Sequence, residues 1–386
     1  MHGGERPCEL AVYALSRAAL PLARRLTARL AVLPWHLLPT PPNSITPKVT
    51  VGYAQIYAPA RFCPKDVRPF TSLPALLAQT YPFFAGHAFI GAAGLAVRCL
   101  APLLIHKSVD APVLVLDTAG QYVISLLSGH WGGGNALARH VASLLQATPV
   151  ITTASDGIDD GHVLALDLLL REAGLRPIDW EFLPHVQGML LEGEHLPLWD
   201  PCHAVPDHPG IYRVGDEQDM FPLTEQAEML FPVLAAHWKR LQAHPQVLRI
   251  AVPWLFLGVG CRRHVNTDLL YDAVCNMLKH HDLEPLAVAG VATVNEKVQE
   301  SAIRTLAARM NVPILGFAAE ALARCITPHP SAAAGQRFGL QDFSVCEAAA
   351  MMAAGSHGKN IRLLVPKSVV SRQITMAVAI ADRGSI

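Results

Sequence analysis

The sequence predicts an α/β protein with two layered α/β domains, mainly parallel sheets and a small irregular middle region that joins them. In both halves, short apolar runs alternate with amphipathic segments of helix length, a pattern typical of α/β layers. Glycine-rich segments follow apolar runs near residues 128 and 258. The chain has 386 residues, of which 51% are hydrophobic and 16% charged, enough for two or three domains of roughly 150 residues each.

The N-terminal domain is predicted to span residues 1–160. Apolar runs predict strands at 9–15, 83–90, 113–117, 122–127 and 150–153. Amphipathic segments predict helices at 17–30, 92–104 and 135–145. Prolines indicate a loop between Leu38 and Pro47. The residues from there to Lys65 carry no clear pattern.

The middle region, residues 161–245, is rich in proline and contains Trp180, Trp199 and Trp238. We expect a small connecting segment there, with one helix near residues 224–243. The C-terminal domain, residues 246–386, predicts strands at 249–258, 285–291, 312–317, 361–365 and 375–380. Asn266 or Thr267 is suited to cap a helix that runs to His280. Further helices are expected at 300–310 and 348–354.

Composition excludes several classes of function. Lys+Arg and Asp+Glu both number 31, which argues against nucleic acid or an acidic membrane surface as the main partner. The eight cysteines form no C-x-x-C pair, so the spacing supports neither a zinc site nor a disulfide framework. No apolar run is long enough for a transmembrane helix, and the charged N-terminus makes a poor signal peptide. We expect a soluble cytoplasmic protein without a bound metal.

The most informative stretch is the glycine-rich segment after the strand at 122–127. Its residues of interest are Ser128, Gly129, His130, Gly132, Gly133, Gly134 and Asn135. A glycine loop that leads into a helix presents free N–H groups and the positive end of the helix dipole. The segment therefore predicts an anion site with Asn135 as the helix cap, although a tight structural turn is the alternative. His130 would lie beside the ligand as an acid/base, a metal ligand or a hydrogen-bonded structural imidazole.

A second glycine segment follows the strand at 249–258 and consists of Gly258, Gly260, Cys261, Arg262 and Arg263. Paired arginines at a turn suit a carboxylate or phosphate, which the guanidinium group binds through two hydrogen bonds. A nicotinamide-dependent oxidoreductase is the competing hypothesis. It is disfavoured because Arg263 occupies the place of the third glycine of the dinucleotide motif.

Other polar residues also follow predicted strands. Gly91, Gly94, Arg98 and Lys107 come after the strand at 83–90, and Thr153 and Asp156 come after the strand at 150–153. Lys297 follows the strand at 285–291, and Glu347 opens an alanine-rich helix. The carboxyl edge of a parallel sheet is where α/β proteins usually bind ligands. Helix capping, a solvated surface arginine and helix-dipole stabilisation are the bland alternatives for these residues.

These segments resemble the CbiG family of cobalt-precorrin-5A hydrolases from anaerobic cobalamin (vitamin B12) biosynthesis. The resemblance rests on residues 89–98 and 101–104, on Lys107 and Asp110, on residues 124–135 (Ile-Ser-Leu-Leu-Ser-Gly-His-x-Gly-Gly-x-Asn) and on residues 151–156. The C-terminal segments at 258–263 and 344–349, with Lys297 and Glu300, resemble a CobE-like domain. The likeness covers nearly the whole chain.

The resemblance implies a specific reaction. The substrate would be a cobalt-containing methylated tetrapyrrole with a lactone, and water would open the lactone and release a two-carbon fragment as acetaldehyde. The product would be the ring-contracted cobalt-precorrin-5B. Cobalt would arrive inside the substrate, so no cofactor or protein-bound metal is expected. Transient contacts with other enzymes of the pathway and a homo-oligomer are compatible with this function.

The residues fit this substrate at one point, because a corrinoid precursor carries many carboxylates. The two glycine segments together with Arg98, Lys107, Arg262 and Arg263 are suited to bind them. We expect His130 to act as an acid/base or to face cobalt, with Asp156 and Glu347 as further acid/base candidates. A corrinoid-binding or channelling protein without catalysis of its own is the alternative function.

Overall fold

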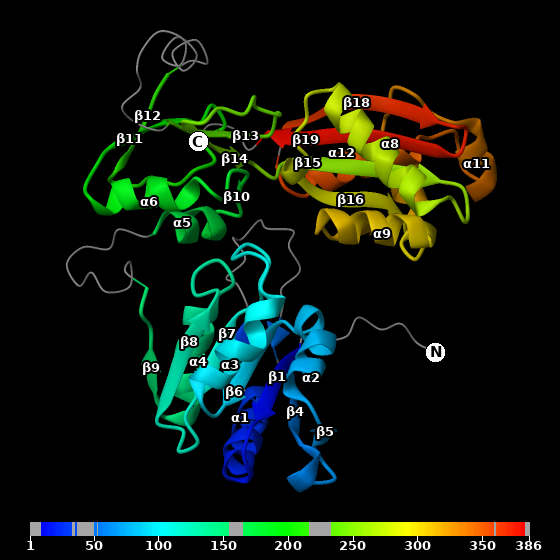
Figure 1. The fold of residues 1–386 in the computed structure, drawn as a ribbon. Coiled ribbons are helices and arrows are strands. Elements are labelled where there is room, and N and C mark those ends of the chain that lie inside the picture. The colour runs from blue at the N-terminus through cyan, green and yellow to red at the C-terminus, as the bar shows by residue number, and fades with distance from the viewer. Residues whose placement is uncertain are drawn as a thin grey trace. The chain divides into compact units, whose positions relative to one another are not determined.

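The computed structural model describes residues 9–32, 35–36, 50–51, 53–153, 165–215, 233–358 and 360–382. They form two compact units that divide between Leu168 and Leu169. Figure 1 shows the first unit in blue to teal and the second in green to red. The described residues contain no helix that is both long and apolar enough to cross a membrane.

The first unit is built on a seven-stranded sheet with the order β5-β4-β1-β6-β7-β8-β9. Its strands are β1 (Glu9–Ala14), β4 (Tyr53–Pro59), β5 (Arg68–Phe70), β6 (Gly86–Ile90), β7 (Val113–Leu116), β8 (Tyr122–Leu127) and β9 (Thr148–Val150). The helices are α1 (Leu20–Val32), α2 (Leu73–Thr80), α3 (Ala93–Leu100) and α4 (Gly134–Leu145). A separate two-stranded sheet joins β2 (Trp35–His36) to β3 (Thr50–Val51).

Helices cover both faces of this sheet, because successive side chains of a strand point to opposite faces. Leu10 and Val12 of β1 pack in one buried cluster with residues of α1 and α4. Ala11 and Tyr13, at the alternate positions, pack in a second cluster with residues of α2 and α3. The first unit is therefore a three-layer α/β structure, as the sequence predicted.

One strand pair departs from the parallel arrangement. Strand β8 pairs antiparallel with β7, with Val113 opposite Leu127 and Leu116 opposite Val123, whereas β8 and β9 are parallel to each other. Only residues 117–121 separate β7 from β8, too few for the crossover that two parallel strands require. The carboxyl end of β8 consequently lies at the opposite sheet edge from the carboxyl end of β6.

The middle region is an ordered sheet rather than an irregular connection. Its order is β10-β14-β13-β11-β12, and its strands are β10 (Arg176–Pro177), β11 (Leu196–Trp199), β12 (Ile211–Arg213), β13 (Val233–His237) and β14 (Val247–Ala251), with helices α5 (Leu166–Glu172) and α6 (Leu183–Leu191). The expected helix near 224–243 is wrong for its described part, because Val233–Ala236 are buried within β13. Its earlier part lies outside the described residues.

The C-terminal sheet has the order β17-β16-β15-β19-β18. Its strands are β15 (Leu255–Cys261), β16 (Val288–Val294), β17 (Ile314–Phe317), β18 (Asn360–Val370) and β19 (Ile374–Asp382). Its helices are α8 (Thr267–His280), α9 (Ser301–Met310), α10 (Ala319–Ala323), α11 (Ala332–Phe338) and α12 (Val345–Gly355). Asn266 caps α8, because its Oδ1 accepts hydrogen bonds from the Asp268 and Leu269 amides at 2.9 and 3.0 Å.

The three C-terminal strands β15, β16 and β17 are parallel, and β19 runs antiparallel between β15 and β18. Cys261 at the end of β15 pairs with Ile374, which pairs in turn with Val370 at the end of β18. The segments that follow β15, β16 and β18 therefore share one sheet edge. Helix α12 begins at this edge and packs across β15, β16 and β19 (Figure 1).

Candidate functional site

The glycine-rich segment at 128–135 forms a tight loop between β8 and α4. Ser128 and Gly133 both have left-handed backbone conformations, with φ values of 54° and 82°. The Ser128 hydroxyl donates to the Asp110 carbonyl at 2.8 Å, which joins this loop to the one before β7. A Cβ atom on Gly132 would lie 2.4 Å from the Ser128 Cβ. The loop is therefore folded too closely on itself to accept a side chain at this position.

Part of the expected anion site is already occupied by the loop itself. The amides of Gly133, Gly134 and Asn135 donate to the carbonyls of His130, Ser128 and Gly129 at 2.9–3.0 Å. A carboxylate at this loop would therefore depend on amides earlier in the loop and on side chains. Asn135 does not cap α4, whose cap residue is Gly133. Its buried side chain instead donates from Nδ2 to Thr153 Oγ1 at 3.0 Å.

His130 forms a recessed pair with a carboxylate. Its Nδ1 lies 3.1 Å from Asp167 Oδ1 and 3.3 Å from Oδ2, and the two side chains are only 11% and 9% exposed. Asp167 lies in the first turn of α5, within the first unit. When the imidazole is neutral, donation from Nδ1–H to Asp167 leaves the lone pair on Nε2. This arrangement is suited to proton transfer at Nε2.

The predicted residues of the first unit fall into two groups. Lys107 lies in the loop before β7, which bonds to Ser128 through Asp110. Thr153 follows β9 and joins the same edge through Asn135. Gly91, Gly94 and the start of α3 lie at the opposite edge, because Gly91 follows β6 and its amide donates to the Leu116 carbonyl. Arg98 is exposed, and its guanidinium group donates back to the Gly94 carbonyl at 3.5 Å. Asp156 lies outside the described residues.

The reversal of β8 explains this separation. Had β8 been parallel to β6 and β7, their carboxyl ends would have met at one edge and brought Gly91 close to Ser128. Gly91 instead packs locally, since a Cβ on this residue would lie 3.0 Å from the side chain of Leu15. We therefore place Lys107, Ser128–Asn135 and Thr153 in one candidate site and leave Gly91, Gly94 and Arg98 outside it.

The two glycines of the second segment lie inside β15 and not in a loop after it. A Cβ on Gly258 would lie 1.8 Å from the Cys346 carbonyl oxygen, and one on Gly260 would lie 2.5 Å from Thr375 Oγ1. Gly258 thus allows α12 to approach the sheet, and Gly260 makes room for the neighbouring strand. The expectation that these glycines form a turn after the strand is wrong, because both lie within β15.

Charged residues nevertheless collect just beyond these glycines. Arg262 and Arg263 are exposed in the turn between β15 and α8. Lys297, only 3% exposed, forms an ion pair with Glu300 at 3.0 Å, and Glu300 also accepts the amide hydrogen of His264 at 2.8 Å. Burial opposes ionisation of Glu300, but these hydrogen bonds and the charge of Lys297 lower its pKa. Burial raises the pKa of the Cys261 thiol, although Lys297 opposes that shift.

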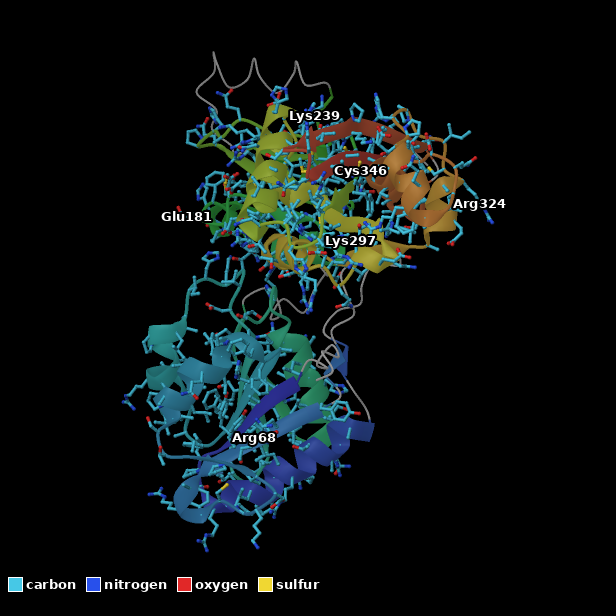
Figure 2. The ribbon with its side chains drawn as sticks, turned by 90° about the vertical axis from the view of Figure 1, so that its right-hand side faces the viewer. Arg68, Glu181, Lys239, Lys297, Arg324 and Cys346 are labelled. Carbon is cyan, nitrogen blue, oxygen red and sulfur yellow. The ribbon has the colours of Figure 1, made fainter. Side chains whose placement is uncertain are left out.

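Glu347 is fully buried at the N-terminus of α12. Its carboxylate accepts hydrogen bonds from the His329 amide at 3.0 Å, from His329 Nδ1 at 2.8 Å and from the Lys367 amide at 2.9 Å. Burial alone would raise the pKa of Glu347, but these donors hold it below its ordinary value. Glu347 therefore resembles a fixed anion more than the acid/base group we expected. Figure 2 labels Cys346, its neighbour in α12, together with Lys297.

Two functional candidates were missed in the sequence, namely Asp167 and His329. Neither follows a glycine segment or belongs to a recognisable motif, and each meets its histidine or carboxylate partner only through the fold. Within the described part of the chain, no group of three or more His, Cys, Asp or Glu side chains is arranged to hold a metal ion.

Two family models match this chain. The model described as cobalamin synthesis G N-terminal matches residues 75–156, and the model described as cobalamin synthesis G C-terminus matches residues 255–379. The first contains the loop at 128–135, and the second contains β15, Lys297 and Glu347.

Curated relatives extend this similarity to most of the chain. A protein of Salmonella typhimurium named cobalt-precorrin-5A hydrolase is 33% identical over 328 residues, which is 82% of this chain and 84% of the relative. A protein of Priestia megaterium with the same name is 26% identical over 322 residues, or 80% and 82% of the two chains. The crystal structure of CobE, from the cobalamin (vitamin B12) biosynthetic pathway, is 28% identical and covers 33% of this chain and 89% of its own. Its TM-score of 0.30 is too low to support an inference.

Proposed function

Because this chain belongs to the cobalamin synthesis G family, we propose that it is a cobalt-precorrin-5A hydrolase. The observation that carries the proposal is the 33% identity with the Salmonella hydrolase over 82% of this chain. The recessed His130–Asp167 pair beside the glycine loop supports it, because hydrolysis requires a group that activates water.

The proposed reaction opens the lactone of the substrate and releases acetaldehyde, to give cobalt-precorrin-5B. A base removes a proton from water as the water oxygen adds to the lactone carbonyl carbon. The acyl–oxygen bond then breaks, and that proton passes to the freed alkoxide. Removal of that hydroxyl proton then allows the oxygen to become the aldehyde carbonyl as the neighbouring carbon–carbon bond breaks. The electron pair of that bond passes to the macrocycle, which takes up a proton. Both proton removals require a base.

We assign the base to His130. Donation from its Nδ1–H to Asp167 fixes the tautomer, so that Nε2 can accept a proton from water. The low exposure of both side chains keeps bulk water away from the pair. Loop amides beside His130 would stabilise the negative charge that develops on the carbonyl oxygen.

Cobalt enters this proposal as part of the substrate, and no cofactor is assigned to the protein. The peripheral carboxylates of the macrocycle need cations. Lys107, in a loop that contacts the glycine loop, is a candidate for one of them. The described free cysteines suit a reducing compartment, so we propose that the enzyme acts in the cytoplasm.

The test is to incubate the purified full chain with cobalt-precorrin-5A and to measure acetaldehyde by a coupled reduction. The corrinoid product is followed by mass spectrometry. Stoichiometric release of acetaldehyde and formation of cobalt-precorrin-5B support the hydrolase. Tight binding of the substrate with no acetaldehyde would instead support a carrier or channelling protein, and the hydrolase proposal would be abandoned.

A further inference from the structure

His329 is held by one carboxylate at two points. It lies between α10 and α11, and both its backbone amide and its ring Nδ1 bond to Glu347, at 3.0 and 2.8 Å. A side chain whose backbone and ring are bound to the same group has little freedom to change its rotamer. Glu347 itself is held by the Lys367 amide and by its place in α12. The orientation of the imidazole is therefore built into the fold.

The two members of this pair differ sharply in exposure. The Glu347 side chain is 0% exposed, whereas the His329 side chain is 56% exposed. An ionised carboxylate only accepts hydrogen bonds, so Nδ1 of His329 must carry a hydrogen. In the neutral imidazole the lone pair is then on Nε2, on the ring side away from Glu347. The structure thus presents an imidazole of fixed orientation on an exposed side chain.

Proteins use this arrangement, among other purposes, to prepare a histidine to bind a metal. A carboxylate that accepts from one ring nitrogen fixes the tautomer and increases the basicity of the other nitrogen. A metal at the centre of a flat macrocycle can be reached only along the axis of the ring. A side chain that projects from the surface, as the 56%-exposed His329 does, can approach the metal along this axis.

Cations lie at the same sheet edge and can bind the periphery of such a macrocycle. Arg262 and Arg263 follow β15, and Lys367 lies near the end of β18, which reaches this edge through β19. Each can pair with a carboxylate. A central metal and peripheral carboxylates are the two features that distinguish a cobalt-corrinoid acid from other anions.

We propose that His329, positioned by Glu347, coordinates the cobalt of a bound corrinoid through Nε2. This proposal rests on the proposed function only because it assumes that the ligand is a cobalt corrinoid. Every contact used here lies within the second unit. His329, and not His130, is the residue that we propose to face cobalt. Glu347 becomes a positioning residue that touches no substrate.

The test uses the full chain with cobyrinic acid, a cobalt corrinoid that carries free carboxylates, in its cobalt(II) form. Electron paramagnetic resonance shows a three-line nitrogen splitting on the cobalt lines when an axial imidazole is bound. We expect that splitting in the wild type and a two-line splitting after ¹⁵N-histidine labelling. His329→Ala should abolish it, and His130→Ala should leave it intact. Wild-type protein that binds the corrinoid without nitrogen splitting, or a splitting that survives in His329→Ala, overturns the proposal.

Glu347→Gln provides the second variant, since it keeps the shape of the side chain but removes its charge. We expect corrinoid affinity to fall about 10-fold to 100-fold, while the remaining complex still shows nitrogen splitting. An unchanged affinity would remove Glu347 from the site. Acetaldehyde release from cobalt-precorrin-5A is measured on the same preparations. Turnover without nitrogen splitting contradicts only the cobalt ligand, and nitrogen splitting without turnover contradicts only the hydrolase.

Discussion

The two units each contain a histidine–carboxylate pair near a glycine segment, but they build the pair in opposite ways. In the first unit both partners are recessed, with His130 11% and Asp167 9% exposed. In the second unit the carboxylate of Glu347 is completely buried and its histidine is 56% exposed. A recessed imidazole is suited to exchange protons away from bulk water, and a projecting one to coordinate a metal. We therefore propose that the same residue types serve different chemistry because their exposure differs.

The glycines of the two segments also differ, because one set lies in a loop and the other in a strand. Gly132, Gly133 and Gly134 lie in a tight loop. The loop has no room for larger side chains and includes left-handed backbone at Gly133. Gly258 and Gly260 lie in a strand and allow close packing of α12 and β19. The first segment forms the loop that we propose as a site, whereas the second packs the scaffold that carries Arg262, Glu347 and His329.

The largest effect is expected from Gly258→Ala. The new Cβ would lie 1.8 Å from the Cys346 carbonyl oxygen, and neither the strand nor α12 can move without disturbing the core. We expect a loss of stability of more than about 3 kcal/mol and little soluble protein, measured by expression and urea unfolding. Gly94→Ala is the matched control, because its Cβ would meet only the end of Arg98 at 3.6 Å. Equal stability of the two variants would refute the packing role of Gly258.

A smaller effect, on the catalytic rate and not on stability, is expected from a change in the His130–Asp167 pair. His130→Ala should lower kcat for acetaldehyde release by about 10²-fold to 10⁴-fold, with little change in corrinoid affinity, because a base is lost and not a ligand. His329→Ala should instead weaken corrinoid binding. Steady-state kinetics and equilibrium titration of both variants check this division.

Asp167→Asn tests whether the contact between Asp167 and His130 contributes to catalysis. The amide preserves size but can present a donor to Nδ1 of His130, which would favour the wrong tautomer for a base at Nε2. We expect kcat to fall without loss of folding, as judged by circular dichroism. Full activity in this variant would show that the His130–Asp167 contact has no part in catalysis.

The sequence predicted most elements of the fold but not the direction of one strand. The apolar run of β8 was recognised, because periodicity reports burial and element type. Strand direction depends on the connection, and the five-residue link 117–121 was the available signal. Asp117 accepts hydrogen bonds from the amides of Ala119, Gln121 and Tyr122, and Gly120 has a φ of 71°. This tight turn could have predicted the hairpin and hence the separation of Gly91 from Ser128.

The candidate site was only partly predictable. His130 and the glycines around it form a contiguous motif, so the sequence identified them. Asp167 and His329 are separated from their partners by 37 and 18 residues, and no local pattern indicates such pairings. The difference between a glycine in a loop and one in a strand was also hidden, because β15 continues to Cys261 rather than ending at Gly258.

Acid should destabilise each unit through a histidine whose pKa is lowered by burial. His87 in the first unit is fully buried between the Tyr13 hydroxyl and the Tyr81 carbonyl, and burial lowers its pKa from 6.5 to about 4. The unfolded chain therefore binds a proton first as pH falls, and this unit loses up to about 3 kcal/mol of stability between pH 6.5 and 4. Hydrogen exchange monitored by mass spectrometry at several pH values reports each unit separately.

The second unit should respond over the same pH range, because burial lowers the pKa of His237 in β13 from 6.5 to about 4. Two carboxylates add a further response at lower pH. The lowered pKa values of Glu300 and Glu347 stabilise the second unit above the ordinary carboxylate pKa of 4.5, and that contribution is lost only as pH falls through the lowered values. His87→Gln cannot take up a proton and should flatten the acid response of the first unit, even if its stability at neutral pH is lower. An unchanged response in that variant would assign the acid sensitivity to other groups.

The smallest expected effect tests how the loop at 128–135 is held. Thr153→Val keeps the shape of the side chain but removes the oxygen that accepts from Asn135 Nδ2, at a cost of about 1 kcal/mol. We expect a modest fall in kcat, because the hydrogen bond ties the loop that carries His130 to the end of β9. Thr293→Val is the matched variant in the second unit, where the hydroxyl donates to the Val259 carbonyl at 2.7 Å within the sheet. Thr293→Val should lower stability without altering kcat, since backbone pairing between strands, and not side-chain hydrogen bonds, holds the segment at 258–263 in place. If both variants changed kcat equally, the distinction between a site built from a loop and one carried by a sheet would fail.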